Sequence, residues 1–279
     1  MRPPLDDLPL DDEAPVAARL RAAGCVFAEE EAAALLAAAT GPGHLAALVD
    51  RRVTGEPLEL VLGWAEFCGL RIAVEPGVFV PRQRTAVLVE RAVALLRDAR
   101  RPPVVVDLCC GSGAVGLAVA ATVGAVELHA ADADPRAVRC ARRNLRPVGG
   151  RVHQGDLYAA LPAGLRGRVD LLAANAPYVP TAAVALLPPE AREHEPRAAL
   201  DGGPDGTDLQ RRVAAGALRW LAPGGTLLVE TGAPQAPRTA AAVAAGGLRT
   251  VVVRDEERDA TVVVGTAPAA PCPDVHGPL

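Results

Sequence analysis

Lysine is absent from the sequence, and all 29 basic residues are arginine. Isoleucine occurs once, at Ile72, and asparagine only at Asn144 and Asn175. This bias indicates a GC-rich coding sequence more than any function. The formal net charge is −4, and no long basic stretch is interleaved with aromatic residues. The sequence therefore gives no electrostatic reason to expect a nucleic acid as partner.

Long apolar runs are also missing. Half of the 279 residues are hydrophobic, enough for one large domain and a small one, but no run approaches the roughly 18 apolar residues of a membrane span. The acidic, proline-rich start, residues 1–15, lacks the basic and apolar segments of a secretory signal. We therefore expect a cytoplasmic protein with no membrane partner.

The six cysteines form no C-x-x-C pair, and two of them, Cys109 and Cys110, are adjacent. This spacing indicates neither a disulfide framework nor a zinc site. The five histidines are scattered without the spacing of metal ligands. We expect buried free thiols in a reducing compartment and no bound metal.

Hydrophobic periodicity predicts helices within residues 13–53, a β-hairpin within 58–77 and an amphipathic helix at 84–100. From residue 104 onward, strands alternate with helices, which predicts a largely parallel sheet covered on both faces. A short charged turn joins the last two strands and suits an antiparallel hairpin. The expected strands are residues 104–108, 125–132, 150–156, 169–175, 224–232, 248–255 and 260–266.

A glycine-rich loop follows the first strand of this alternating series. Gly111, Gly113 and Gly116 match G-x-G-x-x-G, and Asp132 comes about 21 residues after the first of them, at the end of the next strand. Taken alone, the pattern fits a dinucleotide site, where glycines allow close approach of the backbone and the acid binds ribose hydroxyls. It also fits S-adenosylmethionine. A tight turn with ordinary capping acids is the structural alternative.

Two further acids favour S-adenosylmethionine over a dinucleotide. Asp107, four residues before Gly111, would repel a phosphate but can meet the ammonium group of this cofactor. Asp156, in the turn after the following strand, is placed to read an adenine amino group. Because the carboxyl ends of parallel strands meet at one edge of a sheet, we expect these acids to surround one ligand.

The segment "NAPYVP", residues 175–180, follows a further apolar strand. The side-chain oxygen of Asn175 can accept one N–H of an incoming amide or amine, and the carbonyl of Ala176, aimed by Pro177, can accept the other. Tyr178 offers an aromatic face for the planar group. Such contacts would orient the lone pair of a poor nitrogen nucleophile toward a methyl donor. The alternative is an Asx-Pro turn beside a core tyrosine.

The segments "DLCCGSGAVG", "AADADP", "QGDLY" and "NAPYVP", in this order, resemble the protein-(glutamine-N5) methyltransferases, the release-factor-modifying PrmC/HemK family. The resemblance covers roughly residues 50–266. It includes a Pro-Arg segment within residues 51–85, "EPRAALDGGPDG" (195–206) and "LAPGGTLLVETG" (221–232). It implies an S-adenosylmethionine-dependent enzyme that methylates the side-chain amide nitrogen of a glutamine in a release factor or another protein.

The fold implied by this resemblance is α/β. It is a Rossmann-like class I methyltransferase sheet of seven strands, the last two forming an antiparallel hairpin, with a small helical N-terminal domain. The expected division is a helical substrate-docking domain at 1–56, a β-hairpin linker at 57–80, a catalytic domain at 81–266 and a disordered proline-rich tail at 267–279.

The resemblance also implies the roles of individual residues. The catalytic residues are those of the tetrapeptide Asn175, Ala176, Pro177 and Tyr178. The cofactor-binding residues are Asp107, Gly111, Gly113, Asp132, Asp156 and Asn175. The substrate-binding residues are Phe79, Pro81, Arg82, Arg84, Tyr178 and Glu195, the last of these at the entrance.

Two departures from the family pattern suggest a divergent paralogue. The usual N-P-P-Y is N-A-P-Y here, which preserves the backbone carbonyl because Ala176 also supplies one. The usual P-R-P-E-T-E is P-R-Q-R-T-A, so that Arg84 and Ala86 stand where the family has acids. This reverses the local charge beside the expected substrate entrance and leaves the identity of the protein substrate open.

Three other functions fit parts of the sequence. Adenine-N6 and related methyltransferases use the same Asn-Pro-Tyr device on exocyclic amines of nucleic acids, although the acidic balance disfavours them here. An NAD-dependent oxidoreductase would explain the glycine loop but neither Asp107 nor residues 175–178. A non-catalytic cofactor-binding paralogue would explain the altered Pro-Arg segment.

Overall fold

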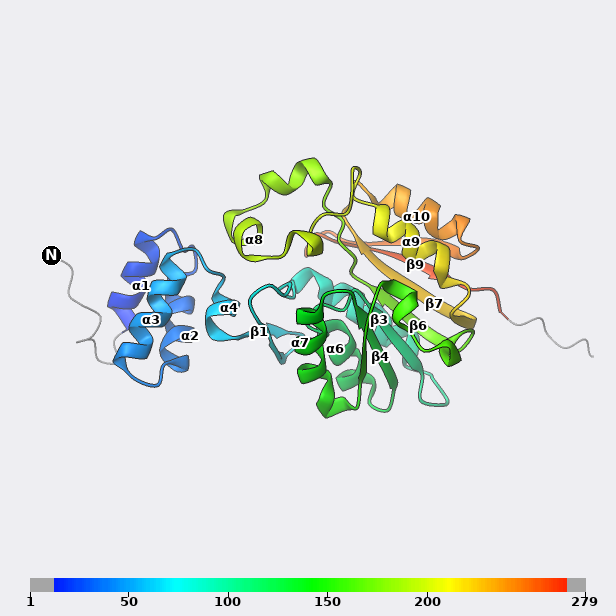
Figure 1. Ribbon diagram of the computed structural model, residues 1–279, viewed down its shortest axis with the longest axis horizontal. Coiled ribbons are helices and arrows are strands. Elements are labelled where there is room, and N and C mark those ends of the chain that lie inside the picture. Colours follow the sequence, from blue (N-terminus) through cyan, green and yellow to red (C-terminus); the bar gives the residue numbers. More distant parts are fainter. Residues whose placement is uncertain (1–12, 270–279) are drawn as a thin grey trace, which may run out of the picture.

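The computed structural model describes residues 13–269, and the predictions for residues 1–12 and 270–279 lie outside this range. The described chain begins with helices that pack on one another, apart from the sheet (Figure 1). Their shared core includes Leu20, Leu35, Leu45 and Val49, all fully buried. The helices are α1 (Glu13–Ala22), α2 (Ala28–Ala38), α3 (Pro42–Val53) and α4 (Leu58–Leu62).

The hairpin between these helices and the sheet is shorter than the sequence predicts. It comprises β1 (Trp64–Phe67) and β2 (Leu70–Ala73), whereas residues 58–62, expected to be part of a strand, form helix α4. Val61 packs into the core of the N-terminal helices and Leu60 packs beneath the hairpin, so one helical turn serves two cores. Gly63, at φ 78°, ends the helix in the left-handed conformation that glycine adopts at little cost.

The hairpin is fixed to the sheet domain by one of the two asparagines. Asn144, on α7 (Pro135–Leu145), accepts the amide of Ala73 at 3.0 Å and donates to its carbonyl at 2.9 Å. These two bonds orient the chain that leaves the hairpin. Residues 77–84 therefore run across the edge of the sheet where the cavity described below opens.

The main sheet has seven strands in the order β5-β4-β3-β6-β7-β9-β8. The pairs from β5 to β7 are parallel, and β9 runs antiparallel to both β7 and β8. The α/β fold with a terminal antiparallel hairpin, expected from the sequence, is confirmed. The strands are β3 (Val104–Leu108), β4 (Glu127–Asp132), β5 (Arg151–Gln154), β6 (Val169–Ala174), β7 (Leu221–Thr231), β8 (Arg249–Asp255) and β9 (Ala260–Thr266).

Helices cover both faces of the sheet, as strands with buried residues on both sides require (Figure 1). Val105 and Leu171 face α5 (Ala86–Leu96), α6 (Ala114–Val123) and α7, whereas Val106 and Leu172 face the other layer. That layer contains α9 (Asp208–Ala217) and α10 (Ala236–Ala245). No helix among residues 13–269 is long and apolar enough to span a membrane.

A segment between β6 and α9 arches over the carboxyl edge of the sheet and carries α8 (Pro189–His194). It contacts the N-terminal helices through an ion pair between Glu190 and Arg52, whose nitrogen and oxygen atoms are 2.8 Å apart. Arg52 is buried and also forms hydrogen bonds with Glu31. The helices at the start of the chain are therefore tied to the segment that covers the cavity.

Candidate functional site

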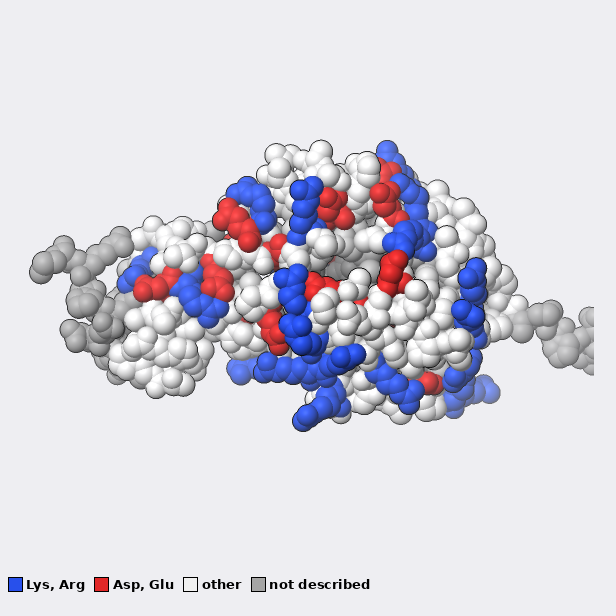
Figure 2. Space-filling view, viewed as in Figure 1, with Lys and Arg blue, Asp and Glu red and all other residues white. Residues whose placement is uncertain are grey.

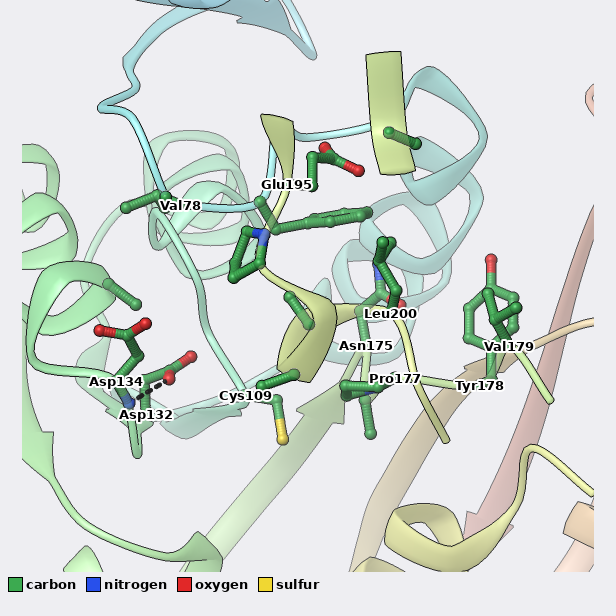
Figure 3. Close-up of a pocket in the computed structure, with 18 of the residues that line it drawn as sticks. Val78, Cys109, Asp132, Asp134, Asn175, Pro177, Tyr178, Val179, Glu195 and Leu200 are labelled. Atoms are coloured by element: carbon green, nitrogen blue, oxygen red, sulfur yellow. Dashed lines mark hydrogen bonds between the residues drawn. The ribbon is translucent and has the colours of Figure 1, made fainter. Parts of the chain in front are cut away.

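A cavity of about 520 Å³ lies at the carboxyl edge of the parallel strands, a size typical of small-molecule sites. Figure 3 shows Asn175, Pro177 and Tyr178 along one side, with Asp132 and Asp134 across from them. In Figure 2, charged residues of both signs gather around the middle of this face of the molecule. The predicted site residues in the cavity wall are Phe79, Arg82, Arg84, Asp132, Asp156, Asn175, Ala176, Pro177, Tyr178 and Glu195.

Asp132 ends β4 and is fixed by its own backbone surroundings. One carboxylate oxygen accepts the amide of Gly111 and the other that of Asp134, each at 2.9 Å. Burial raises the pKa of this carboxyl, and the two amides partly oppose that shift. Each oxygen can accept a second hydrogen bond, so Asp132 is a rigid acceptor pair suited to the hydroxyls of a ribose.

Asp156 follows β5, the strand that pairs with β4, and it also lines the cavity. Its carboxylate forms an ion pair with Arg212 of α9 at 2.5 Å, and 62% of its side chain is exposed. The adjoining Gly155 also lines the cavity. A Cβ at Gly155 would lie 3.1 Å from that of Ala160, so glycine lets this turn close tightly.

Three predicted cofactor residues stand behind the cavity wall. Asp107 is 2% exposed, and its carboxylate accepts the amide of Gly116 at 2.9 Å. Burial raises the pKa of Asp107 to about 7. Gly111 and Gly113 form the turn into α6 but do not line the cavity, whereas Cys109 does. Direct contact of these three residues with a cofactor stays a prediction.

Asn175 directly follows β6, and its amide is held in one orientation. Its Nδ2 donates to the hydroxyl of Thr85 at 3.3 Å. Thr85 is 3% exposed and belongs to the Pro-Arg segment, 90 residues earlier in the chain. Because the donor end is bonded to Thr85, the carbonyl end, Oδ1, is left to accept a hydrogen bond from a ligand.

The next residue, Ala176, presents a second acceptor. It is fully buried in the cavity wall, and its carbonyl accepts no hydrogen bond from residues 13–269. A buried carbonyl without a partner is costly, and a ligand N–H would relieve that cost. The arrangement around residue 175 thus offers two acceptors, which suits a group that carries two N–H bonds.

The loop of residues 201–206, "DGGPDG", and the preceding Leu200 hold the backbone after Asn175 in place. Val179 donates to the carbonyl of Leu200 at 3.0 Å and accepts the amide of Gly202 at 2.8 Å. A Cβ at Gly202 would lie 2.6 Å from the carbonyl oxygen of Pro177, so only glycine allows this approach. The loop therefore fixes the backbone that aims residues 175–178.

Tyr178 belongs to a polar cluster that the sequence analysis did not find. Its hydroxyl donates to Glu230 of β7 at 3.2 Å, and Glu230 is 2% exposed. Burial of the ring raises the pKa of the Tyr178 hydroxyl. Thr85 and Arg84 lie close to the same carboxylate. Thr85 and Glu230 lie within segments that carry the family resemblance, but no local pattern in the sequence indicates that they meet.

The remaining predicted substrate residues meet at the top of the cavity. Glu195 accepts the amide of Val80 at 3.1 Å and the guanidinium of Arg82 at 2.7 Å. That guanidinium lies over the Phe79 ring, 5.0 Å from its centroid. Burial raises the pKa of Glu195, and Arg82 opposes this shift. Of the predicted set, Pro81 does not line the cavity.

The comparison with known proteins decides the family. Residues 69–187 match the model of the family described as "Methyltransferase small domain". The chain is 44% identical to the release factor glutamine methyltransferase of Geobacter sulfurreducens, over 70% of this chain and 68% of the relative. It belongs to the release factor glutamine methyltransferase family.

A relative with a different name matches almost as well. The 4-amino-L-phenylalanine/4-methylamino-L-phenylalanine methyltransferase of Streptomyces pristinaespiralis is 41% identical, over 67% of this chain and 65% of that protein. Among solved structures, the hMettl16 catalytic domain in complex with MAT2A 3'UTR hairpin 6 covers 84% of this chain with a TM-score of 0.57. At 12% identity, that likeness concerns the fold alone.

The cofactor of this family member is S-adenosylmethionine, which supplies an electrophilic methyl group bonded to a sulfonium sulfur. The residues of the cavity fit it. Asp132, Asp134 and Asp156 place three carboxylates in the wall, which suits a cofactor with an ammonium and a sulfonium group. Asp132 would hold the ribose hydroxyls and Asp156 the adenine amino group. The carbonyl of Ala176, without a partner among residues 13–269, could accept an N–H of the methyl acceptor, and this role stays a prediction.

Proposed function

We propose that the protein transfers a methyl group to the side-chain amide nitrogen of a glutamine in a protein, for which a release factor is the first candidate. The observation that carries this proposal is the pair of acceptors at residues 175 and 176. Asn175 is held by Thr85 with its oxygen free, and the neighbouring carbonyl of Ala176 has no partner among residues 13–269. The primary amide of glutamine has the matching two N–H bonds.

This arrangement suits a nitrogen that is a poor nucleophile. The lone pair of an amide nitrogen is delocalised into its carbonyl group, so a general base alone does little for it. Two fixed acceptors instead orient the N–H bonds and stabilise the positive charge that develops during transfer. The Tyr178 ring lines the same cavity and limits the planar group to one orientation.

The names of the relatives support a glutamine acceptor, since the Geobacter sulfurreducens protein carries that activity in its name. Docking of a protein partner fits the helices before residue 57, because Arg52 of α3 forms an ion pair with Glu190 above the cavity. We propose residues 1–56 as the docking domain, 57–80 as the linker and 81–266 as the catalytic domain.

A second candidate acceptor is the aromatic amine of a free amino acid. It is favoured by the 41% identity to the Streptomyces pristinaespiralis enzyme, whose name specifies 4-amino-L-phenylalanine. An aromatic amine also carries two N–H bonds on a planar group and would satisfy the same pair of acceptors.

The test is methyl transfer from labelled S-adenosylmethionine to a purified bacterial release factor and to 4-amino-L-phenylalanine, with mass spectrometry to locate the methyl group. We expect one methyl group on a glutamine side chain. Asn175→Ala should reduce turnover at least tenfold while calorimetry shows unchanged cofactor binding. Methylation of the amino acid alone would replace the first candidate by the second. Full activity of Asn175→Ala would remove the observation on which the proposal rests.

A further inference from the structure

Arg84 is a cation in the wall of the cavity for which the glutamine reaction has no use. It lies in the 3₁₀ turn Gln83–Thr85, and 41% of its side chain is exposed. Its Nε is buried and has no hydrogen-bond partner. An arginine in this state is incomplete, because a planar fork of N–H donors is usually matched by a carboxylate or phosphate.

The carboxylate nearest to Arg84 does not complete it. Glu230 Oε1 lies 3.9 Å from Nε, too far for a hydrogen bond, and it already accepts the Tyr178 hydroxyl. The second oxygen, Oε2, is buried without a partner. Glu230 therefore attracts the guanidinium, but the two groups do not form the two parallel hydrogen bonds of a bidentate arginine–carboxylate pair.

Within the described chain, the charges of the cavity wall are paired with an opposite charge, with three exceptions: Arg84, Glu59 and Asp132. Arg82 is bonded to Glu195, and Asp134, Asp156 and Glu190 each form an ion pair with an arginine. Asp132 accepts two backbone amides instead. Within residues 13–269, Arg84 is the cavity arginine without a hydrogen-bonded carboxylate, and Glu59 is an acid of the wall without an ion pair. The compensated pairs are Arg52–Glu190, Arg82–Glu195, Arg136–Asp134 and Arg212–Asp156.

The position of Arg84 relates it to the acceptor nitrogen. Asn175, which would receive that nitrogen, is bonded to Thr85, the residue that follows Arg84. Tyr178, which would lie against the planar group, shares Glu230 with Arg84. The unpaired cation and the proposed N–H acceptors thus line one cavity and are linked through Thr85 and Glu230.

We propose that Arg84 is a carboxylate-binding subsite of the acceptor site, so that the preferred acceptor carries a carboxylate in addition to the nitrogen that is methylated. This inference rests on the proposed function, because it assumes an acceptor nitrogen at Asn175. The carboxylate belongs either to a free amino acid or to an acidic side chain beside a glutamine. A neutral glutamine loop would leave the guanidinium without a partner.

The test compares acceptors that differ only in the carboxylate. One pair is 4-amino-L-phenylalanine and its carboxamide; the other is a short peptide with glutamine flanked by glutamate and the same peptide flanked by glutamine. Binding is measured by calorimetry on protein saturated with S-adenosylhomocysteine, and methyl transfer is measured separately with S-adenosylmethionine. We expect the carboxylate member of at least one pair to bind about tenfold to a hundredfold more tightly, as charge-assisted hydrogen bonds do. The pair that shows the preference identifies the source of the carboxylate.

Three variants complete the experiment. Arg84→Gln should abolish the preference and Arg84→Glu should invert it. Arg91→Gln, an exposed arginine on the neighbouring helix α5, should leave it unchanged. Equal binding of both members of both pairs to the native protein, or an equal loss in Arg91→Gln, would overturn the inference. If methyl transfer occurs but no carboxylate preference is seen, only the role of Arg84 is overturned. If binding depends on the carboxylate but no methyl group is transferred, only the proposed function is overturned.

Discussion

The hydroxyl of Thr85 is the sharpest point at which the site can be perturbed. Thr85→Val replaces it with a methyl group of similar size at a side chain that is 3% exposed. The native hydroxyl accepts Asn175 Nδ2 at 3.3 Å. Burial raises the pKa of the nearby Glu230 carboxyl, and the Thr85 hydroxyl partly opposes that shift. The substitution therefore removes two interactions without opening a cavity.

The two lost interactions have separable consequences. A neutral hydrogen bond contributes about 0.5–1.5 kcal/mol, so an Asn175 amide that is free to rotate should slow turnover by about threefold to tenfold. Loss of the polar hydroxyl beside the buried Glu230 carboxyl should lower the free energy of unfolding by about 1–3 kcal/mol. Cofactor affinity should not change, because Thr85 does not lie among the acids of the cofactor side.

The assay measures methyl transfer, calorimetric binding of S-adenosylmethionine and urea unfolding on the same preparations. Thr85→Ser retains the hydroxyl and should recover most of the lost rate. Thr122→Val is the matched control, since that hydroxyl bonds only to the carbonyl of Ala118 on α6. Native turnover in Thr85→Val, or a rate loss matched by weaker cofactor binding, would refute the assignment of Thr85 as the residue that positions Asn175.

Three further outcomes are expected. Asp132→Ala should weaken S-adenosylmethionine binding at least tenfold by calorimetry, and an unchanged affinity would remove Asp132 from the cofactor site. Glu195→Ala should lower the free energy of unfolding in urea by about 2–4 kcal/mol, because it leaves the Arg82 guanidinium and the Val80 amide without their hydrogen-bond acceptor. An unfolding midpoint equal to that of the native protein would contradict this role. Burial raises the pKa of Asp107 from 3.8 to about 7 in the folded protein. Protonated Asp107 therefore stabilises the fold at low pH, and this stabilisation is lost as the pH rises through 7. Asp107→Asn should lose less stability between pH 4 and 8 than the native protein, and parallel pH profiles would count against a buried titrating carboxyl.

Much of the fold could be predicted because the strands have recognisable patterns in the sequence. Runs such as residues 104–108 are too short and too β-branched for helices, and the acids that follow them mark one edge of a parallel sheet. The sequence predicts a strand for residues 58–62 because a five-residue segment with four apolar residues fits either period. Only the packing of Val61 against the N-terminal helices decides in favour of a helix.

The polar cluster could not be predicted, since its members come together only through the sheet. Thr85 and Glu230 are 145 positions apart, and their contact depends on α5 packing beside β7. The sequence shows that the charge at Arg84 is unusual. It does not show that Nε of Arg84 lacks a hydrogen-bond partner, because this follows from the 3.9 Å between Nε and Glu230 Oε1 in the folded chain. Sequence patterns identify single residues at the ends of strands, whereas hydrogen-bond partners across strands require the folded chain.

The two sides of the cavity are built from different parts of the chain, and this bears on how acceptors can vary within the family. The cofactor side consists of strand ends and their turns, with Asp132 held by the backbone of its own neighbours. The proposed acceptor side joins three distant segments: the Pro-Arg stretch at Arg82 and Arg84, residues 175–178, and the covering segment at Glu195. A substitution such as an arginine at position 84 can therefore change the charge presented to the acceptor without disturbing the cofactor. Two relatives that are about two fifths identical to this chain fit such a division. One is named for a glutamine in a release factor and the other for 4-amino-L-phenylalanine, an aromatic amino acid.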